Sequence, residues 1–356
     1  MPQLIQSLPE GPVDIIGDVH GEAEALHRLL YRLGCNPAKG TAQRPIVFVG
    51  DLVDRGPDSP EVVETVMHLV HKGLAHCVLG NHELNILLGS TKEGNGWFWS
   101  NPSDGFQIQQ RDAVQHHPFS SAAASPAQAD RFRQFFETLP LGMARPDLRV
   151  VHACWHTPTV ESLPESGDVR QLTIQWAEEI RRELKHSGII AKEKKEREAF
   201  GGLTRLDIRP SHDLPAHAHA AQTRQSRHPI KVLTSGKEVR VPFEEMFYVG
   251  GKWRLVRRQD WWNTYDEAPA VVVGHYWRRR GQAWVTGKPD AWSTNQYTDW
   301  AGPKKNVFCV DYSAGLRFKE RLEGRADGFD GGLAAMRWPE RTLVFDDMDA
   351  PVPTHM

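Results

Sequence analysis

Short apolar runs alternate with amphipathic stretches along the first part of the chain. The runs Val13–Ile16, Ile46–Val49 and Ala75–Leu79 predict three buried strands. Two helices are predicted between them, one ending at Gly34 and one running from Ser59 to Gly73. Their inward faces carry Leu26, Leu29, Leu30 and Leu33, and then Val62, Val63, Val66, Leu69 and Val70. Alternating strands and helices favour an α/β fold.

The same pattern returns later, interrupted by a stretch of different composition. After a polar segment at residues 120–128, a helix carries Phe132, Phe135, Phe136 and Leu139 inward, and Leu148–Val151 and Ala270–Val273 are predicted strands. Between these strands we expect a long charged helix from Asp168 to about Glu198, a turn-rich segment at Ser211–His228 and short β-like runs from Ile230 to Arg258. We therefore expect one domain over residues 1–349, with 168–262 as an insertion or cap and 350–356 as a tail.

Composition and charge narrow the class of protein. Hydrophobic residues make up 40% and charged residues 25%, as is typical of a folded globular protein. Because 43 Lys and Arg nearly balance 45 Asp and Glu, we expect neither a nucleic-acid nor a membrane partner, and any phosphate recognition must be local. The four cysteines show no metal or disulfide spacing, and no signal peptide or long apolar segment occurs. These features predict a cytoplasmic protein.

Polar residues gather where the predicted strands end. The first three strands run into Gly17-Asp18-Val19-His20-Gly21, Gly50-Asp51-Leu52-Val53-Asp54-Arg55-Gly56 and Gly80-Asn81-His82-Glu83. The two later strands run into His152-Ala153-Cys154 and Gly274-His275. Since ligands bind at the carboxyl edge of an α/β sheet, we expect these loops to converge on one site.

The side chains at that edge are metal ligands. Residues two apart in extended backbone point the same way, so Asp18 and His20 can reach one ion. The full set has no thiolate and suits Mn²⁺, Fe or Zn²⁺: Asp18, His20, Asp51, Asn81, His152 and His275. Six ligands exceed what one open catalytic ion takes, so we predict two divalent ions that share Asp51.

These motifs, in this order, resemble the calcineurin-like metallophosphoesterase superfamily, specifically its phosphoprotein-phosphatase branch. The resemblance runs from Gly17 to His275. It implies a metallophosphatase catalytic domain, a four-layer αββα sandwich of two mixed β-sheets with an inserted cap region. It also implies two divalent ions, with Mn²⁺ expected and Fe or Zn as alternatives. The implied reaction is hydrolysis of a phosphate monoester by a metal-bridging hydroxide, on a phosphorylated protein, as in serine/threonine phosphatases, or on a small phosphorylated substrate.

The resemblance assigns roles to individual residues. It implies that Asp18, His20 and Asp51 bind the first ion, and that Asp51, Asn81, His152 and His275 bind the second. It further implies that His82 protonates the leaving oxygen, that Asp54 pairs with His82, and that Arg55, with Asn81 and His82, binds the phosphate.

Three departures bear on the substrate. The later segments Val273–Trp277, Val307–Ser313 and Gly331–Trp338 are similar to bacterial phosphatase-like members, and the S-A-P-N-Y motif of the eukaryotic enzymes is missing. Bacterial diadenosine-tetraphosphate hydrolases are also similar but usually lack an acid at the position of Asp54. A dinucleoside polyphosphate or nucleotide hydrolase is therefore the alternative, and a non-catalytic metal-binding scaffold is an alternative of another class.

Cys154 stands where the family commonly has Gly. A second phosphate-binding arginine has five candidates: Arg205, Arg224, Arg227, Arg257 and Arg258.

Several other residues have simpler interpretations. We expect His217 and His219 in a solvated loop, and Cys154 as a small buried thiol. Packing is the expected role of Trp97, Trp99, Trp261 and Trp262, and Lys192–Glu198 is expected to be an exposed helix face.

Overall fold

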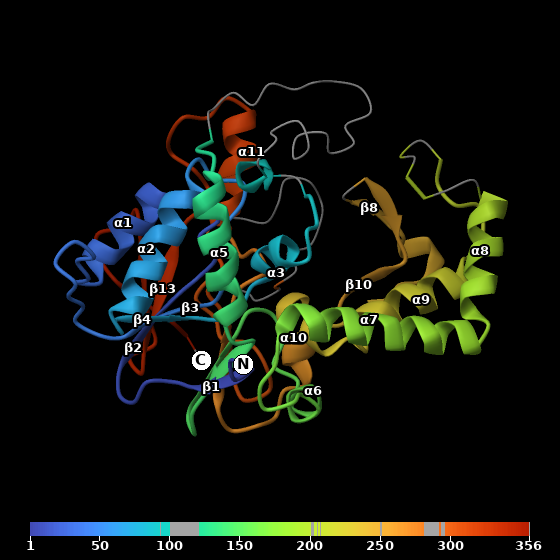
Figure 1. The fold of residues 1–356 in the computed structure, drawn as a ribbon, viewed down its shortest axis with the longest axis horizontal. Coiled ribbons are helices and arrows are strands. Elements are labelled where there is room, and N and C mark those ends of the chain that lie inside the picture. Colours follow the sequence, from blue (N-terminus) through green and yellow to red (C-terminus); the bar gives the residue numbers. More distant parts are fainter. Residues whose placement is uncertain are drawn as a thin grey trace.

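Two β-sheets lie face to face at the centre of the molecule, flanked by helices (Figure 1). The computed structural model describes residues 1–355 except 93, 100–120, 201, 202, 205, 207, 250, 281–291 and 293–295. Arg205, a candidate for the second phosphate-binding arginine, and residue 120 of the polar segment lie outside the described residues. The arrangement confirms the α/β sandwich of two mixed sheets.

The larger sheet has six strands in the order β15-β14-β13-β2-β3-β4. Its parallel half, β2 to β4, is made of the three strands predicted from the first apolar runs, although β3 and β4 end earlier than expected. Its antiparallel half comes from the C-terminal part of the chain. The bounds are β2 Val13–Ile16, β3 Ile46–Phe48, β4 Ala75–Cys77, β13 Ala334–Trp338, β14 Thr342–Phe345 and β15 Val352–Pro353.

The second sheet has five strands in the order β1-β5-β6-β11-β12. Only the β5–β6 pair is antiparallel within it, and β6 and β11 are the two later strands expected from the sequence. The bounds are β1 Ile5–Ser7, β5 Gly142–Ala144, β6 Leu148–Val151, β11 Ala270–Val273 and β12 Val307–Cys309.

Side chains alternate along the strands between an inner and an outer core. Ile15 and Val47 lie in the core between the sheets, where they meet Val150 and Val272 of the second sheet. The next residues along β2 and β3, such as Phe48, face the outer core with the helices. These strands are therefore buried on both faces, which explains why neighbouring positions such as Ile15–Ile16 and Ile46–Phe48 are all apolar.

Helices cover the outer faces of the sandwich. Helices α1 and α2 pack on each other and against β14 and β4. Pro60 lies in the first turn of α2, and the Asp58 side chain caps this helix by accepting a hydrogen bond from Glu61 N at 2.9 Å. The bounds are α1 Ala23–Arg32, α2 Ser59–His71, α3 Asn81–Leu87, α5 Pro126–Thr138, α6 Thr157–Glu161 and α11 Arg317–Leu322, with 3₁₀ turns η1 Gly96–Phe98, η3 Trp261–Thr264 and η4 Ala314–Leu316.

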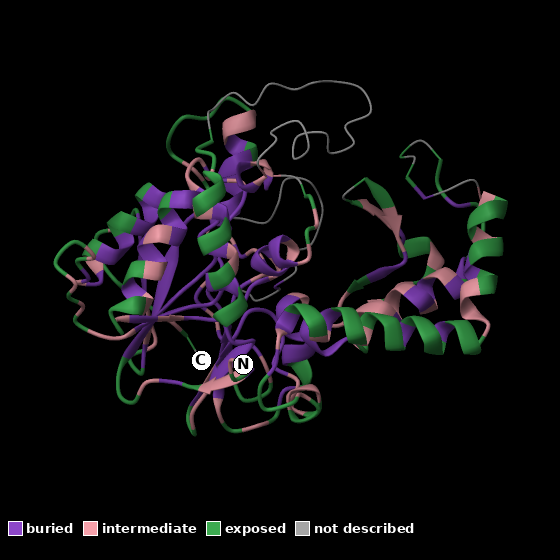
Figure 2. Ribbon diagram, viewed as in Figure 1, coloured by how far each residue is buried: buried purple, intermediate pink, exposed green. Residues whose placement is uncertain are grey.

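The elements from α7 to β10 extend from the sandwich, and we call them the cap (Figures 1 and 2). Helix α7 starts on the sandwich, where Val169 is buried, and runs outward to Ile180 and Leu184, which pack with Ala220 of α9. A second small cluster forms around Leu214 and other residues of the cap. The bounds are α7 Val169–His186, α8 Ile189–Phe200, α9 Pro215–Ser226, α10 Pro229–Ser235, β7 Glu238–Arg240, η2 Phe243–Glu245, β8 Phe247–Val249, β9 Lys252–Arg254 and β10 Val256–Arg258.

The structure corrects three expectations about the cap. The charged helix from Asp168 is two helices, because Gly188 takes a left-handed conformation (φ 72°) after α7. Ser211–His228 was expected to be turn-rich but forms helix α9 over most of its length, and Glu196 accepts hydrogen bonds from the backbone of Ala216 and His217 in its first turn. The segment from Ile230 begins with helix α10 before the expected strands appear.

The C-terminal residues also differ from the expectation. The segment 350–356 was expected to be a tail, but Val352–Pro353 pairs with β14 as the edge strand β15. Trp300 donates from its indole Nε1 to Thr354 Oγ1 at 2.7 Å, which ties this segment to the inter-sheet core. Across the described helices, none is long and apolar enough to cross a bilayer.

Candidate metal centre

Asp51 lies at the centre of the converging loops. Its Oδ2 atom is 3.3 Å from His152 Nε2, 3.8 Å from His82 Nε2 and 3.9 Å from His20 Nε2. His152 and His20 lie in the loops after β6 and β2, His82 lies in the first turn of α3 after β4, and Asp51 itself follows β3. The strand ends therefore meet as the sequence predicts.

Two groups of ligand atoms share that carboxylate. In each of the groups His20–Asp51–His82 and Asp51–His152–His275, the ligand atoms lie within 4.8 Å of one another. Asp18 Oδ2 is 4.0 Å from His20 Nε2, and Asn81 Oδ1 is 3.2 Å from His152 Nε2. All six residues expected to bind metal thus lie in one place, with Asp51 common to both groups.

The backbone at these loops adopts uncommon conformations. His20, Asp51 and His275 have φ values of 48°, 47° and 70°, in the left-handed region that non-glycine residues rarely occupy. Asp54 and Arg55 share this feature. Such residues cost on the order of 1–3 kcal/mol each and persist only where the surroundings fix them. Hydrogen bonds from the backbone of Val19 and His20 to Asp51 O help to do so.

Glu83 holds the central loop and was missed as a site residue in the sequence. Its Oε1 accepts from Leu52 N at 2.8 Å, and its Oε2 accepts from Asp51 N and Gly80 N, both at 3.0 Å. Burial, together with the nearby Asp51 carboxylate, raises the pKa of Glu83 to about 7. A Cβ on Gly80 would lie 2.3 Å from Asp51 N, so only glycine permits this approach. The signal was present, since Glu83 occupies the third position of α3 as in a capping box.

His82 and Asp54 form the expected pair. Asp54 Oδ2 lies 2.5 Å from His82 Nδ1, and Asp54 is fully buried. The other carboxylate oxygen of Asp54 accepts from Trp97 Nε1 at 2.7 Å. Trp97 is thus both a packing residue, as expected, and a partner of the pair, a role that no sequence pattern indicated.

Arg55 reaches across the two histidines on one side of Asp51. Its Nη1 is 2.9 Å from His20 Nε2 and its Nη2 is 3.2 Å from His82 Nε2. Its guanidinium lies 5.0 Å from the ring centre of Trp277, a cation–π contact. A Cβ on Gly315 would lie 2.6 Å from Arg55 Nη1, so the backbone of η4 closes the other side.

The electrostatics of the centre suit divalent cations. Burial and the neighbouring carboxylates Asp311 and Asp51 raise the pKa of Asp18 well above its ordinary value. Burial and nearby positive groups lower the pKa values of His20 and His275 well below theirs, so both rings are neutral donors. Although burial opposes it, the imidazoles of His152 and His82 hold the pKa of Asp51 well below its ordinary value. A divalent ion is bound by carboxylates and neutral imidazoles that lie close together. These residues therefore fit the two divalent ions expected from the sequence.

Among the arginines of the cap, Arg258 lies nearest the centre in electrostatic terms. After burial and His152, its charge lowers the pKa of His275, and it opposes the large rise that burial causes in the pKa of Tyr276. Arg224 instead pairs with Glu193 and Arg227 with Glu183 within the cap, and Arg257 lies 3.5 Å from Asp260. Of the four described candidates for a second phosphate-binding arginine, Arg258 is thus the one whose charge acts on an expected metal ligand, and it also pairs with Glu238.

The remaining expectations have mixed outcomes. Cys154, Trp261 and Trp262 are buried as expected, and Trp99 is half-buried. The expectation of a solvated loop for His217 and His219 is wrong, because both lie on α9. His217 is partly buried with its Nδ1 3.2 Å from Glu193 Oε1. The face Lys192–Glu198 is likewise not wholly exposed, since Glu193 is buried.

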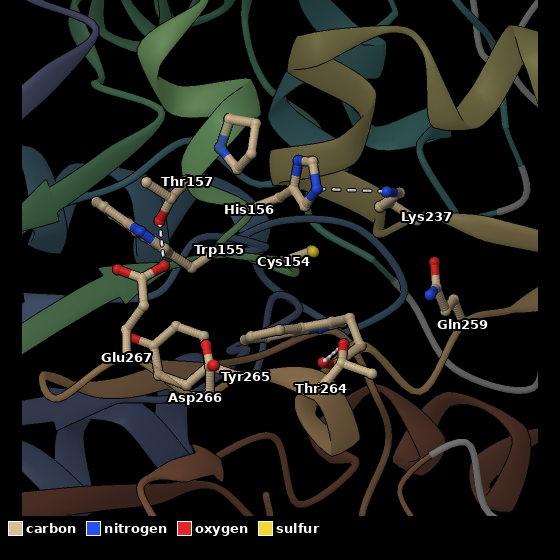
Figure 3. Close-up of a pocket in the computed structure, with 12 residues that line it drawn as sticks. Cys154, Trp155, His156, Thr157, Lys237, Gln259, Thr264, Tyr265, Asp266 and Glu267 are labelled. Atoms are coloured by element: carbon tan, nitrogen blue, oxygen red, sulfur yellow. Dashed lines mark hydrogen bonds between the residues drawn. The ribbon is translucent and has the colours of Figure 1, made fainter.

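A cavity of about 160 Å³ is lined on one side by Cys154, two residues after His152 (Figure 3). It is lined by Trp155, His156, Lys237 and Glu267, among others, and by none of the six expected metal ligands. Thr157 donates to Glu267 at its edge, and Lys237 Nζ lies 3.4 Å from His156 Nε2. The cavity is thus separate from the reacting groups.

Comparisons with known proteins point in one direction. A model of the family described as calcineurin-like phosphoesterase matches residues 11–301. The asymmetrical bis(5'-nucleosyl)-tetraphosphatase PrpE of Oceanobacillus iheyensis is 53% identical over 74 residues, which are 20% of this chain and 30% of that protein. The protein of the same name from Halalkalibacterium halodurans is 48% identical over 73 residues, which are 19% and 30%.

The sequence identity to these two curated relatives is confined to 20% and 19% of this chain. The chain spans 30% of the length of each of these curated relatives. Among solved structures, a cold-active protein-tyrosine phosphatase from a Shewanella species is 16% identical, covers 98% of this chain and 83% of that one, and gives a TM-score of 0.47.

Proposed function

Because the chain belongs to the calcineurin-like phosphoesterase family, we propose that it is a dimetal phosphatase that hydrolyses phosphate monoesters. The observation that carries this proposal is the sharing of Asp51 between two groups of buried ligand atoms. Asp18, His20 and Asp51 would together bind the first ion. The second ion would also be held by Asp51, with Asn81, His152 and His275. We propose Mn²⁺ in both positions, since the oxygen and nitrogen ligands suit it.

The chain's own residues would bind the phosphate and move a proton. When bound, two such ions supply a hydroxide nucleophile at neutral pH and neutralise charge on the phosphoryl oxygens. Arg55 would hold the phosphate oxygens with its two terminal nitrogens, with Asn81 beside it and Arg258 from the cap side. His82 would donate a proton from Nε2 to the leaving oxygen. Asp54 fixes the ring from Nδ1 at 2.5 Å, which supports this role.

The substrate class has two candidates. The His82–Asp54 pair favours monoesters with poor leaving groups, such as phosphoserine or phosphothreonine in a protein or a small phosphorylated molecule. Dinucleoside polyphosphates are the second candidate, favoured by the local identity to the two tetraphosphatases. A screen of phosphopeptides against dinucleoside polyphosphates at fixed metal concentration separates the two.

Metal dependence tests the proposal directly. We expect chelation to abolish p-nitrophenyl phosphate hydrolysis and Mn²⁺ to restore it. Asp51→Asn should lose bound metal and lower turnover by roughly 10²-fold or more, since even outer-shell changes reach that size. The control Asp349→Asn, at an exposed carboxylate paired with Arg32, should behave as wild type. Full activity in metal-free protein, or two ions with unchanged turnover in Asp51→Asn, contradicts the proposal.

A further inference from the structure

The cavity lined by Cys154 is large enough for a small organic molecule. Its volume of about 160 Å³ compares with roughly 150 Å³ for a closed apolar cavity that holds one benzene molecule. Pro158, Thr264 and Asp266 also line it and are exposed, so the cavity opens to solvent on their side. It therefore has room for about one six-membered ring, with a substituent that extends toward the opening.

Aromatic side chains form the inner walls of this cavity, and hydrogen bonds hold two of them in place. Trp155, Trp261 and Tyr265 line it, and each is only 5% exposed. Trp261 Nε1 donates to Ala153 O at 3.1 Å, and the Tyr265 hydroxyl donates to Pro269 O at 2.9 Å. The rings of Trp261 and Tyr265 meet edge to face, with centroids 5.9 Å apart. Fixed aromatic walls favour a flat ring as the occupant.

Two polar side chains of the lining lack hydrogen-bond partners. The indole Nε1 of Trp155 is buried and makes no hydrogen bond with any residue that the structure describes. The side-chain amide of Gln259, which is half-buried, likewise makes none within the described ranges. A buried N–H group without an acceptor is unfavourable, and in native proteins such groups are nearly always paired. We therefore expect an occupant that carries hydrogen-bond acceptors.

One lysine gives the cavity a positive end. In Figure 3, Lys237 and Gln259 lie at one end, and Thr157 and Glu267 lie at the other. Lys237 Nζ is 3.4 Å from His156 Nε2 and forms no ion pair with the residues that the structure describes. Burial and the charge of Lys237 lower the pKa of His156, so this ring is neutral at neutral pH. The positive charge at this end therefore belongs to Lys237.

The acidic residues at the other end do not require a cation from a ligand. Glu267 Oε2 accepts from Arg149 Nη1 at 2.6 Å, and its Oε1 accepts from the Thr157 hydroxyl. Asp266 is exposed at the opening, where water and salt screen its charge. Among the residues that line the cavity, Lys237 is thus the buried charge without a counter-charge. It matches a singly charged anion better than a cation or a dianion.

We infer that this cavity binds a small organic carboxylate built on one flat ring. The carboxylate would accept hydrogen bonds from Lys237 and Gln259, and the ring would lie against the aromatic walls. A hydroxyl or ring nitrogen on the far side of the ring would accept from Trp155 Nε1. The inference goes beyond the proposed phosphatase function, because none of the expected metal ligands lines the cavity.

Calorimetric titration with 4-hydroxybenzoate tests the site without turnover. We expect Mn²⁺-loaded wild type to bind it with a dissociation constant of about 1 mM or lower, as befits a ligand of this size. Lys237→Met should weaken binding at least about tenfold, the effect of one lost charge-assisted hydrogen bond, and Lys237→Arg should largely retain it. Benzylamine, a cation of similar size, should bind at least about tenfold more weakly than 4-hydroxybenzoate. No binding of 4-hydroxybenzoate to wild type would overturn the inference.

A pair of ligands tests the Trp155 donor separately. Benzoate lacks the ring hydroxyl, so wild type should prefer 4-hydroxybenzoate by about threefold or more. Trp155→Phe should remove this preference, and the ratio of the two constants is insensitive to a general loss of packing. Gln259→Leu should weaken the binding of both ligands, and it keeps the test decisive if Lys237→Met does not fold. An unchanged ratio in Trp155→Phe, with unchanged constants in Gln259→Leu, would overturn the inference.

Two control variants locate the bound molecule. Lys72→Met removes an exposed lysine at the end of α2 and should leave the constants unchanged. Asp51→Asn, which should lose metal, should also bind 4-hydroxybenzoate as wild type does. Binding lost in Asp51→Asn but kept in Lys237→Met would place the carboxylate on the metal ions and overturn the inference. Equal constants in Lys72→Met and Lys237→Met would overturn it as well.

Discussion

His82 is held from both sides of its ring, and this limits what the residue can do. Nδ1 is engaged by Asp54, which Trp97 and full burial keep in place. Nε2 faces Asp51 at 3.8 Å and Arg55 at 3.2 Å. Only Nε2 is therefore directed toward the groups that would hold the phosphate. The ring is oriented as a proton donor to a leaving oxygen requires.

The general-acid role proposed for His82 predicts a dependence on the leaving group. Nitrophenolate leaves readily without a proton, whereas a serine alkoxide does not. His82→Asn should therefore slow phosphopeptide hydrolysis by roughly 10²- to 10⁴-fold and p-nitrophenyl phosphate hydrolysis far less. Asp54→Asn should also slow phosphopeptide hydrolysis more than p-nitrophenyl phosphate hydrolysis, but by a smaller factor. This substitution only weakens the contact that orients the His82 ring. Kinetics on both substrates, with metal content measured in parallel, check this.

His71→Asn, at an exposed histidine at the end of α2, serves as the control and should leave both rates unchanged. Equal losses on the two substrates in His82→Asn, with both metal ions retained, would return the proton to water or to another residue.

The residues found from the sequence and those missed differ in a physical way. Asp18, His20 and Asp51 are polar residues directly after apolar strands, a pattern that stands out along the chain. Trp97 and Gly315 act through contacts made across the fold, with Asp54 and Arg55. An indole or a glycine in a loop gives no periodic signal, so only the folded structure reveals such partners.

At the scale of elements, the sequence predicted the strands of the sandwich better than the helices of the cap. β3 and β11 are buried on both faces and consist only of apolar residues, and β2 and β6 each contain one charged residue among apolar ones. Helix α9 carries small residues such as Ala216 and Ala220 and lacks a strong apolar stripe. Its first turn depends on Glu196, twenty residues earlier. A helix stabilised by a distant partner is not predictable from local pattern.

The edge strand β15 should contribute measurably to stability. Thr354 Oγ1 accepts from Trp300 Nε1 at 2.7 Å and donates to Arg341 O at 2.7 Å. Trp300 is fully buried, so Thr354→Val leaves its indole N–H without a partner. We expect the free energy of unfolding to fall by about 1 to 3 kcal/mol. Urea unfolding with an unchanged slope and a lower midpoint would show this, and a midpoint equal to wild type would contradict it.

The junction between α9 and α10 should be sensitive to acid. Burial lowers the pKa of His228 to about 4, and its Nε2 is 3.0 Å from Thr173 O. The unfolded chain takes up this proton near pH 6.5 and the folded chain only near 4. The stability contributed by neutral His228 is therefore complete above about pH 6.5 and is lost as the pH falls toward 4.

Between pH 7.5 and 5, wild type should thus lose about 2 kcal/mol of unfolding free energy through His228. His228→Gln should show a loss smaller by that amount, measured by urea unfolding at both pH values. His71→Gln, at an exposed site, should lose as much as wild type. An unchanged pH dependence in His228→Gln would show that folding does not lower the pKa of His228.

At the scale of the whole molecule, the outer part of the cap has its own packing, whereas Val169 and helix α10 at its base pack in the core of the sandwich. The expected metal ligands follow strands of the sandwich, and the outer cap is built on two small clusters around Ile180 and Leu214. The α/β sandwich was predictable because strand and helix periods recur along the chain. The cap was recognised only as a change in composition, because its clusters are too small to impose a clear period on the sequence.

The buried carboxylate of Glu193 should stabilise the cap without affecting metal binding. It accepts from both terminal nitrogens of Arg224, at 2.8 and 2.6 Å, and lies 3.2 Å from His217 Nδ1. Glu193→Ala leaves these groups without their acid. Because Arg224 is 43% exposed, water will partly replace the carboxylate, and we expect a local loss of roughly 1 to 3 kcal/mol.

Hydrogen exchange should then accelerate in α8 and α9 but not in β2 and β3. Two metal ions and aryl phosphate turnover should be retained, since no expected ligand lies in the cap. Glu198→Ala removes an exposed acid that pairs with Lys194 on the same helix, and should leave exchange unchanged. Loss of metal from folded Glu193→Ala would show that cap and centre are one cooperative unit. If the two variants accelerated exchange equally, contacts other than the buried Glu193 pairs must hold α8 to α9.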